Sequence, residues 1–230
     1  MENIKDIKDI KELSEKMKGK TLSILGDSIS TYKGVSNNER ANKNLFYNPC
    51  FYREPYPVEG TYWKMILNTL GMELCVNNSW SGGNLSGRDN ENSGVNRACE
   101  LSRDDGTEPD FIILFMGMND LGRGINPEIF ATDYEETLRR IKGKYPKAKV
   151  CCVNMPNRDY RMKNETEVFN GIIENAVNNA GDGVFMADFF NCPLENDNYY
   201  NNTVDGLHPD PDGMRMISEF IIEAMKKNLL

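Results

Sequence analysis

The chain has 230 residues, of which 39% are hydrophobic and 27% charged, as is usual for a globular protein with one sizeable core. Its formal net charge of −8 argues against nucleic acid, whose phosphates require clusters of Lys and Arg, and against docking on anionic lipid. No apolar run approaches the ~20 residues of a membrane span, and the charged N-terminal segment lacks the apolar core of a secretory signal. We therefore expect a cytoplasmic protein that does not act at a membrane.

Two kinds of apolar pattern alternate along the chain. Steps of three and four residues predict amphipathic helices, and short apolar runs predict buried strands. In chain order we predict a helix over 4–18, a strand over 21–25, a helix over 60–70, strands over 73–77 and 110–116, a helix over 127–144, a strand over 149–154, a helix over 165–180, a strand over 184–188 and a helix over 211–228. One further short helix is expected at about 95–101.

The alternation of strands and helices determines the predicted fold. The run DFIILFM at 110–116 has no polar face, as expected for a strand that is covered on both sides. Asn126 with Pro127, and Asp210, are placed to cap the helices that follow them. Strands joined through helices form right-handed β-α-β units with parallel strands. We predict an α/β protein, a flavodoxin-like three-layer αβα sandwich with about five parallel strands, as a single domain over 1–230.

Two long connections depart from this alternation. Residues 31–60 are rich in Tyr, Phe, Asn and Pro, and residues 81–109 are rich in Gly, Ser and Asp. Both follow carboxyl ends of predicted strands, where ligands bind in open parallel sheets. The aromatic residues of the first connection either form a wall for a sugar ring or acyl chain or fold the loop down, with Tyr47, Phe51 and Tyr52 as substrate-binding candidates. Tyr62 and Trp63, on the helix that follows, are predicted to lie in the core.

The six cysteines favour reduced thiols over a metal site. Cys75, Cys151 and Cys152 fall in predicted strands and should be buried, whereas Cys50 and Cys99 fall in loop-like sequence. The chain has no C-x-x-C and a single histidine, so a zinc site of usual spacing cannot be built from it. From these residues we expect no metal site.

Four short motifs follow the predicted strands: GDS at 26–28, SGG at 81–83, GMND at 117–120 and DGLH at 205–208. A serine hydroxyl becomes a good nucleophile only when a base removes its proton, and the base needs a partner that fixes its tautomer. His208, the only histidine, is the natural base near neutral pH, and Asp205 stands three residues before it. Ser28, His208 and Asp205 can therefore supply nucleophile, base and acid.

Acyl transfer also needs donors for the oxyanion of the tetrahedral intermediate. The backbone N–H groups of Ser28 and Gly82 and the side-chain amide of Asn119 are the candidates. A glycine at 82 allows the backbone to come close to a substrate.

The motifs in this order resemble those of the GDSL (SGNH) hydrolase family of esterases and acylhydrolases, from about residue 21 to 215. The resemblance implies that Ser28 is the nucleophile, that Gly82 and Asn119 are oxyanion-hole residues, and that Asp205 and His208 are the acid and base. The family's Leu after the serine is Ile29 here. It further implies an αβα sandwich without metal or nucleotide cofactor, acting on a small-molecule ester.

The substrate remains open at this stage. The polar and aromatic character of residues 31–60 favours short acyl groups such as acetyl on a carbohydrate or other small polar carrier. A lipid acylhydrolase, lysophospholipase or thioesterase with the same site is the alternative. Outside enzymes, a flavodoxin-like binding module or a catalytically silent relative is possible, although the chain has no G-x-x-x-x-G-K-[ST] and no G-x-G-x-x-G. The sequence does not indicate an oligomeric state.

Overall fold

A five-stranded, fully parallel sheet forms the centre of the molecule. The computed structural model describes residues 4–35, 45–49, 56–156, 163–190 and 199–230. The strand order is β2-β1-β3-β4-β5, the flavodoxin-like order. The strands are β1 (Thr21–Gly26), β2 (Glu73–Ser79), β3 (Phe111–Phe115), β4 (Lys149–Val153) and β5 (Val184–Ala187).

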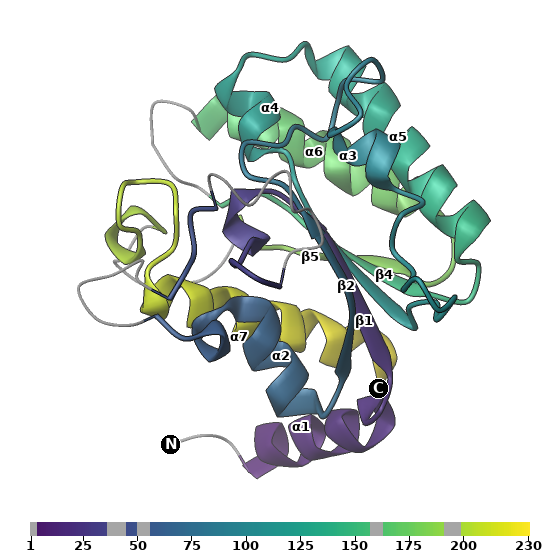
Figure 1. Ribbon diagram of the computed structural model, residues 1–230, viewed down its shortest axis with the longest axis vertical. Helices are drawn as coiled ribbons and strands as arrows, with labels where there is room; N and C mark the ends of the chain where they lie inside the picture. The colour runs from purple at the N-terminus through teal and green to yellow at the C-terminus, as the bar shows by residue number, and fades with distance from the viewer. Residues whose placement is uncertain (1–3, 36–44, 50–55, 157–162, 191–198) are drawn as a thin grey trace.

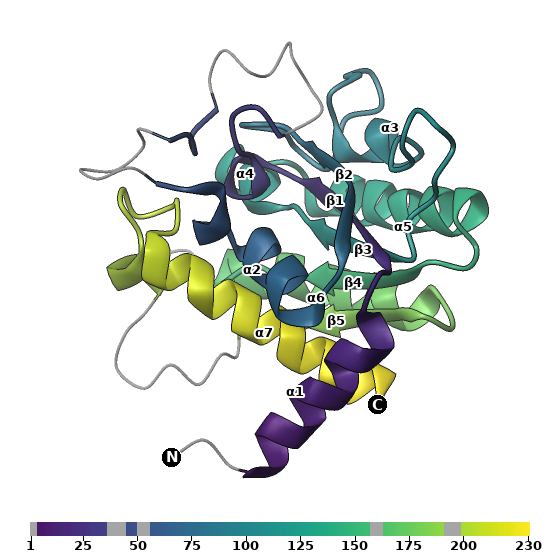
Figure 2. The same ribbon diagram turned by 60° about the horizontal axis from the view of Figure 1, so that its bottom comes forward.

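Helices cover both faces of this sheet (Figures 1 and 2). One layer contains α1 (Ile4–Met17), α2 (Tyr62–Leu70) and α7 (Pro211–Leu229), which contact one another. The other contains α3 (Gly94–Arg97), α4 (Met118–Gly122), α5 (Pro127–Lys144) and α6 (Lys163–Asn179). The predicted αβα arrangement is confirmed.

Local sequence explains where the elements lie. Every residue of β3 is buried, which accounts for its unbroken apolar run. Asn126 accepts a hydrogen bond from the Glu128 N–H at the start of α5, and Asp210 accepts one from the Gly213 N–H at the start of α7. Both predicted caps are therefore confirmed.

The core contains the aromatic residues predicted for it. Tyr62 and Trp63 are almost completely buried, as expected. Cys75, Cys151 and Cys152 are buried free thiols and Cys99 is exposed, whereas Cys50 lies outside the described residues. Within the described ranges, no helix has the length and apolar character to cross a membrane.

Two short helices differ from what the sequence indicated. The helix expected at about 95–101 is a single turn over Gly94–Arg97. The motif at 117–120 opens the short helix α4, where no helix was predicted. Gly117 allows this because its φ of +134° lets the chain turn directly from β3 into the helix.

Candidate active site

The four sequence motifs come together at the carboxyl edge of the sheet. Residues 26–28 close β1, residues 81–83 follow β2, and residues 117–120 follow β3. The segment containing 205–208 precedes α7 and returns to the same edge, beside the turn after β1 (Figure 1). Segments about 180 residues apart in the chain therefore share one site.

Ser28, His208 and Asp205 form a continuous hydrogen-bonded chain. The Ser28 Oγ lies 2.9 Å from the His208 Nε2. The other ring nitrogen of His208, Nδ1, lies 2.8 Å from the Asp205 Oδ2. If Asp205 accepts the Nδ1 proton, Nε2 is left with the lone pair that can accept a proton from Ser28.

A short 3₁₀ turn (η1, Ser28–Ser30) positions the serine. Asp27 precedes it, and its Oδ1 accepts the Ile29 N–H at 3.0 Å. The amide of Asn77 on β2 donates to the Ser30 carbonyl at 2.9 Å, and the Ser30 hydroxyl lies 2.7 Å from the Tyr62 hydroxyl. These bonds fix the turn against the neighbouring strand and α2.

A hydrogen-bonded loop positions the histidine. The Asp205 Oδ1 accepts the backbone N–H groups of Leu207 and His208, at 3.0 and 2.8 Å. Partial burial acts to raise the pKa of Asp205, but these bonds and the His208 ring outweigh it and hold the pKa below its usual range. The carboxylate therefore remains ionised while it orients the ring. The loop is closed by pairing of Thr203 with Pro209.

Aromatic rings support the imidazole. The Phe46 ring stacks on the His208 ring with centroids 3.5 Å apart and planes 15° from parallel. Tyr47 is completely buried, approaches the imidazole edge-on, and donates its hydroxyl hydrogen to the Pro209 carbonyl at 2.8 Å. In this arrangement Tyr47 braces the histidine loop, and its contact with substrate stays a prediction.

The two other aromatic substrate-binding candidates, Phe51 and Tyr52, lie outside the described residues. Phe46 was not singled out by sequence reasoning as a neighbour of the histidine. Nothing in the local pattern around residue 46 indicates which of the loop aromatics meets His208, about 160 residues away.

Asn119 lies beside the serine turn, and Gly82 immediately precedes the residue whose carbonyl the Asn119 amide contacts. Gly82 has φ of +71°, a conformation that side chains with a Cβ rarely adopt. Neither Ser28 N–H nor Gly82 N–H has a hydrogen-bond partner among the residues that the structure describes. The Asn119 Nδ2 donates to the Gly83 carbonyl at 3.1 Å and to the Asp27 Oδ2 at 3.3 Å. Serving a third acceptor would require this amide to share or release one of these bonds.

Asp27 is a buried acid whose position was not anticipated from sequence. Burial raises the pKa of Asp27 to about 7, hydrogen bonding from the Ile29 N–H opposes the rise, and the nearby Asp120 adds to it. Asp120 in turn accepts the backbone N–H groups of Leu85 and Ser86, at 2.8 and 2.9 Å. It therefore anchors the loop after β2.

Arg97 supplies the positive charge behind this site. Its side chain is buried, and it donates to the backbone carbonyls of Gly26 at 3.2 Å, Asn92 at 2.9 Å and Asn78. Its charge lowers the pKa of Asp27, in opposition to burial. A single guanidinium thus links the ends of β1 and β2 to the loop that follows β2. In the sequence Arg97 shows only as one basic residue in a short polar helix.

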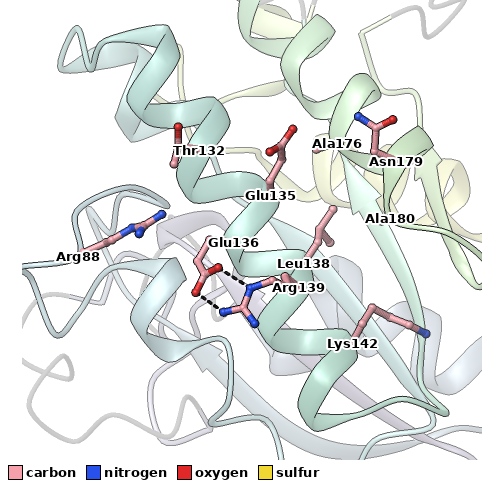
Figure 3. A pocket seen from close by; sticks show the side chains of 10 residues that line it. All are labelled: Arg88, Thr132, Glu135, Glu136, Leu138, Arg139, Lys142, Ala176, Asn179 and Ala180. Carbon is pink, nitrogen blue, oxygen red and sulfur yellow. Dashed lines mark hydrogen bonds and ion pairs between the residues drawn. The ribbon is translucent and has the colours of Figure 1, made fainter.

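A separate pocket of about 630 Å³ lies between α5 and α6 (Figure 3). Its lining includes the ion pair of Glu136 and Arg139, and it includes none of the residues of the four motifs. Within the described part of the chain, no group of three or more His, Cys, Asp or Glu side chains is arranged to hold a metal ion.

This fold and set of motifs place the protein in a known class of hydrolases. The model of the GDSL-like Lipase/Acylhydrolase family matches residues 24–216, and the chain belongs to this family. The protein is therefore an ester-hydrolysing enzyme. A comparison with curated proteins gave no match.

Solved structures share the fold at low sequence identity. A protein described as a GDSL-like lipase from Bacteroides ovatus matches with a TM-score of 0.71 and 23% identity, over 92% of this chain and 100% of that one. A lipase/acylhydrolase from Enterococcus faecalis matches with a TM-score of 0.61 and 17% identity, over 90% and 96% of the two chains. A carbohydrate esterase family 2 enzyme with a carbohydrate binding domain, from Corynascus thermopiles (Myceliophthora fergusii), matches with a TM-score of 0.63 and 18% identity, over 93% and 67%.

Proposed function

We propose that this protein is a serine esterase that removes short acyl groups, such as acetyl, from a carbohydrate or another small polar carrier. The observation that carries the proposal is the unbroken chain from the Ser28 Oγ to the His208 Nε2, at 2.9 Å, and from Nδ1 to Asp205, at 2.8 Å. Both distances lie within hydrogen-bonding range, so proton transfer needs no rearrangement of these groups.

In the proposed reaction, His208 takes the proton of the Ser28 hydroxyl as its Oγ attacks the ester carbonyl. Asp205 holds the imidazole and stabilises its positive charge. The carbonyl oxygen becomes an oxyanion, which accepts hydrogen bonds from the backbone N–H groups of Ser28 and Gly82 and from the Asn119 amide.

Collapse of this intermediate breaks the bond between the carbonyl carbon and the alcohol oxygen. His208 gives its proton to the leaving alcohol, and the acyl group remains on Ser28 as an ester. Water then attacks this acyl-enzyme, with His208 again taking a proton and returning it to Ser28 Oγ. The products are a free acid and a free alcohol, and the enzyme is restored.

The substrate class rests on the residues around the site. Residues 31–60 are polar and aromatic and contain no long apolar stretch that could shelter a fatty chain. A carbohydrate esterase among the similar structures accords with this choice, and a lipase/acylhydrolase among them keeps a lipid ester as the second candidate.

We also propose that the chain works as a single domain over 1–230.

The first experiment replaces the proposed nucleophile. Ser28→Ala should reduce hydrolysis of p-nitrophenyl acetate to the uncatalysed level while the melting temperature changes little, because the substitution removes one small group whose described hydrogen bond is to the His208 ring. Ser14→Ala, in α1, is the matched control and should leave the rate unchanged. Labelling with a fluorophosphonate followed by mass spectrometry should modify Ser28 and no other residue. Full activity in Ser28→Ala would refute the mechanism.

A series of p-nitrophenyl esters tests the acyl group. We expect kcat/KM to be highest for acetate and to fall as the chain lengthens towards palmitate. A maximum at long chains would replace the carbohydrate ester by a lipid ester as the substrate.

A further inference from the structure

Arg123 lies directly beside the proposed oxyanion hole. It follows α4 and stands four residues after Asn119, whose carbonyl accepts the Arg123 N–H at 3.0 Å. Residues four apart on a helix lie on the same face, so the two side chains leave the helix in similar directions. A guanidinium therefore follows the Asn119 amide by one turn, at the C-terminal end of α4.

The Arg123 guanidinium is held over Gly82. Its Nη1 donates to the Asn84 Oδ1, and a Cβ placed on Gly82 would lie 3.3 Å from Nη2. An oxyanion bound to the Gly82 N–H lies about 2.9 Å from that nitrogen, so the guanidinium is at most about 9 Å from the reacting carbonyl. That distance spans only a few covalent bonds of a substrate.

The charge of Arg123 has no carboxylate partner in the described part of the chain. The other arginines at the described surface each lie within 4.0 Å of a carboxylate, namely Arg88, Arg103, Arg139, Arg140 and Arg215. Arg123 is exposed, and its one described side-chain hydrogen bond is to a neutral amide. In a protein with a formal net charge of −8, a cation at the site that has no carboxylate partner among the described residues is conspicuous.

We propose that Arg123 binds an anionic group, a carboxylate or a phosphate, on the alcohol part of the ester. This inference rests on the proposed function, because the anion is located relative to the reacting carbonyl. An acetyl group carries no charge of its own, so the anion belongs to the carrier. The planar guanidinium offers parallel N–H donors that match carboxylate and phosphate oxygens, and among the described residues only Asn84 accepts one of them. An acetylated acidic sugar or sugar phosphate has this chemistry.

Matched acetyl esters test the proposal. 4-Acetoxybenzoate and 4-acetoxybenzamide have nearly the same shape and differ in charge, and 4-acetoxyphenyl phosphate provides the phosphate form. For the wild type, kcat/KM for ester hydrolysis should be about ten-fold higher with an anionic ester than with the neutral 4-acetoxybenzamide. This is the size expected of one charge-assisted hydrogen bond. The anionic ester with the larger dependence on Arg123 identifies the carrier as carboxylate or phosphate.

Substitutions of Arg123 then test whether this residue causes the preference for anionic esters. In Arg123→Gln the preference for the anionic ester should fall about ten-fold, and Arg123→Lys should retain part of it because the charge remains without the planar fork. Lys11→Gln, which removes one positive charge from the exposed face of α1, should retain the full preference. Added salt should weaken the preference in the wild type and leave Arg123→Gln unaffected, because salt screens exposed charges.

Two outcomes would overturn the proposal. Equal losses on the charged and neutral esters in Arg123→Gln would mean that Arg123 only holds the loop or assists the reaction itself. An unchanged preference for the anionic ester in Arg123→Gln would mean that the anion binds elsewhere than at Arg123. Hydrolysis of the acetyl ester of 4-acetoxybenzamide by the wild type, lost in Ser28→Ala, measures the proposed esterase function separately. The esterase function and the role of Arg123 can therefore fail independently.

Discussion

The buried carboxyl of Asp27 should affect both the stability of the protein and, through its contact with the Asn119 amide, the reaction. The substitution Asp27→Asn tests these two effects by separate measurements. The carboxyl is buried, its Oδ1 accepts the Ile29 N–H at 3.0 Å, and its Oδ2 accepts from the Asn119 amide at 3.3 Å. An asparagine of the same shape can keep one acceptor only, since its second position becomes an NH₂ donor. If its oxygen faces Ile29, its NH₂ group faces the Asn119 amide, donor against donor.

The magnitude follows from the pKa. Burial raises the pKa of Asp27 from 3.8 to about 7, so the folded state keeps this proton over a range in which the unfolded chain has lost it. A state that binds the proton more tightly is stabilised at low pH, and the wild type therefore loses stability as the pH rises through this range. Each pKa unit corresponds to about 1.4 kcal/mol. Between about pH 5.5 and pH 8.5, the stability of the wild type falls only up to the folded pKa of about 7. This interval of about 1.5 pH units corresponds to a loss of about 2 kcal/mol in the free energy of unfolding.

Asp27→Asn has no proton to lose, so its free energy of unfolding should lack this contribution. The difference in unfolding free energy, variant minus wild type, should increase by about 2 kcal/mol between about pH 5.5 and pH 8.5. Urea unfolding of both proteins at intervals of half a pH unit measures it. Asp104→Asn, at an exposed acid, is the matched control and should show a nearly constant difference.

The same substitution should reduce activity. With the Asn119 amide displaced, one oxyanion donor is misplaced, and kcat for p-nitrophenyl acetate should fall by about 100-fold. A difference in stability that does not change with pH would show that Asp27 is not a buried acid of raised pKa. Wild-type kcat in Asp27→Asn would show that its contact with Asn119 has no role in the reaction.

Two further substitutions test the groups around the serine. Asp205→Asn should lower kcat by about a thousand-fold or more, because an amide NH₂ facing Nδ1 favours the tautomer of His208 with its proton on Nε2, which cannot accept the Ser28 proton. Asn119→Ala should lower kcat by about 100- to 1000-fold with a smaller change in KM, because the oxyanion exists only after attack. Initial rates over a range of p-nitrophenyl acetate concentrations measure both, and a KM effect without a kcat effect in Asn119→Ala would assign that residue to substrate binding alone.

Much of the fold could be predicted from local patterns. The apolar run of β3 and the caps Asn126 and Asp210 depend on residues close together in the chain, and they were found where the sequence indicated. The short elements were predicted less well. The turn at 94–97 and α4 are too short to establish a period, and α4 depends on the positive φ of Gly117, which no apolar pattern reveals.

The candidate site could likewise be predicted only in part. The residue types and the order of the motifs pointed to Ser28, Asp205 and His208, and the rule that parallel strands end at one edge predicted that they would meet. The environment of these residues was not visible in the sequence. The stacking of Phe46 on His208 and the hydrogen bond from Arg97 to the Gly26 carbonyl, next to Asp27, join segments whose separation along the chain carries no information about distance.

The sequence by itself determined the alternation of strands and helices, the family, and a set of groups able to perform acyl transfer, because these depend on local periodicity and on short ordered motifs. Only the tertiary structure decided that a buried carboxyl beside the serine has a raised pKa and that the guanidinium of Arg123 lies over Gly82 without a carboxylate partner among the described residues. The physical reason is that burial and electrostatic interaction depend on which atoms lie within a few ångströms, and that is fixed by packing between distant segments.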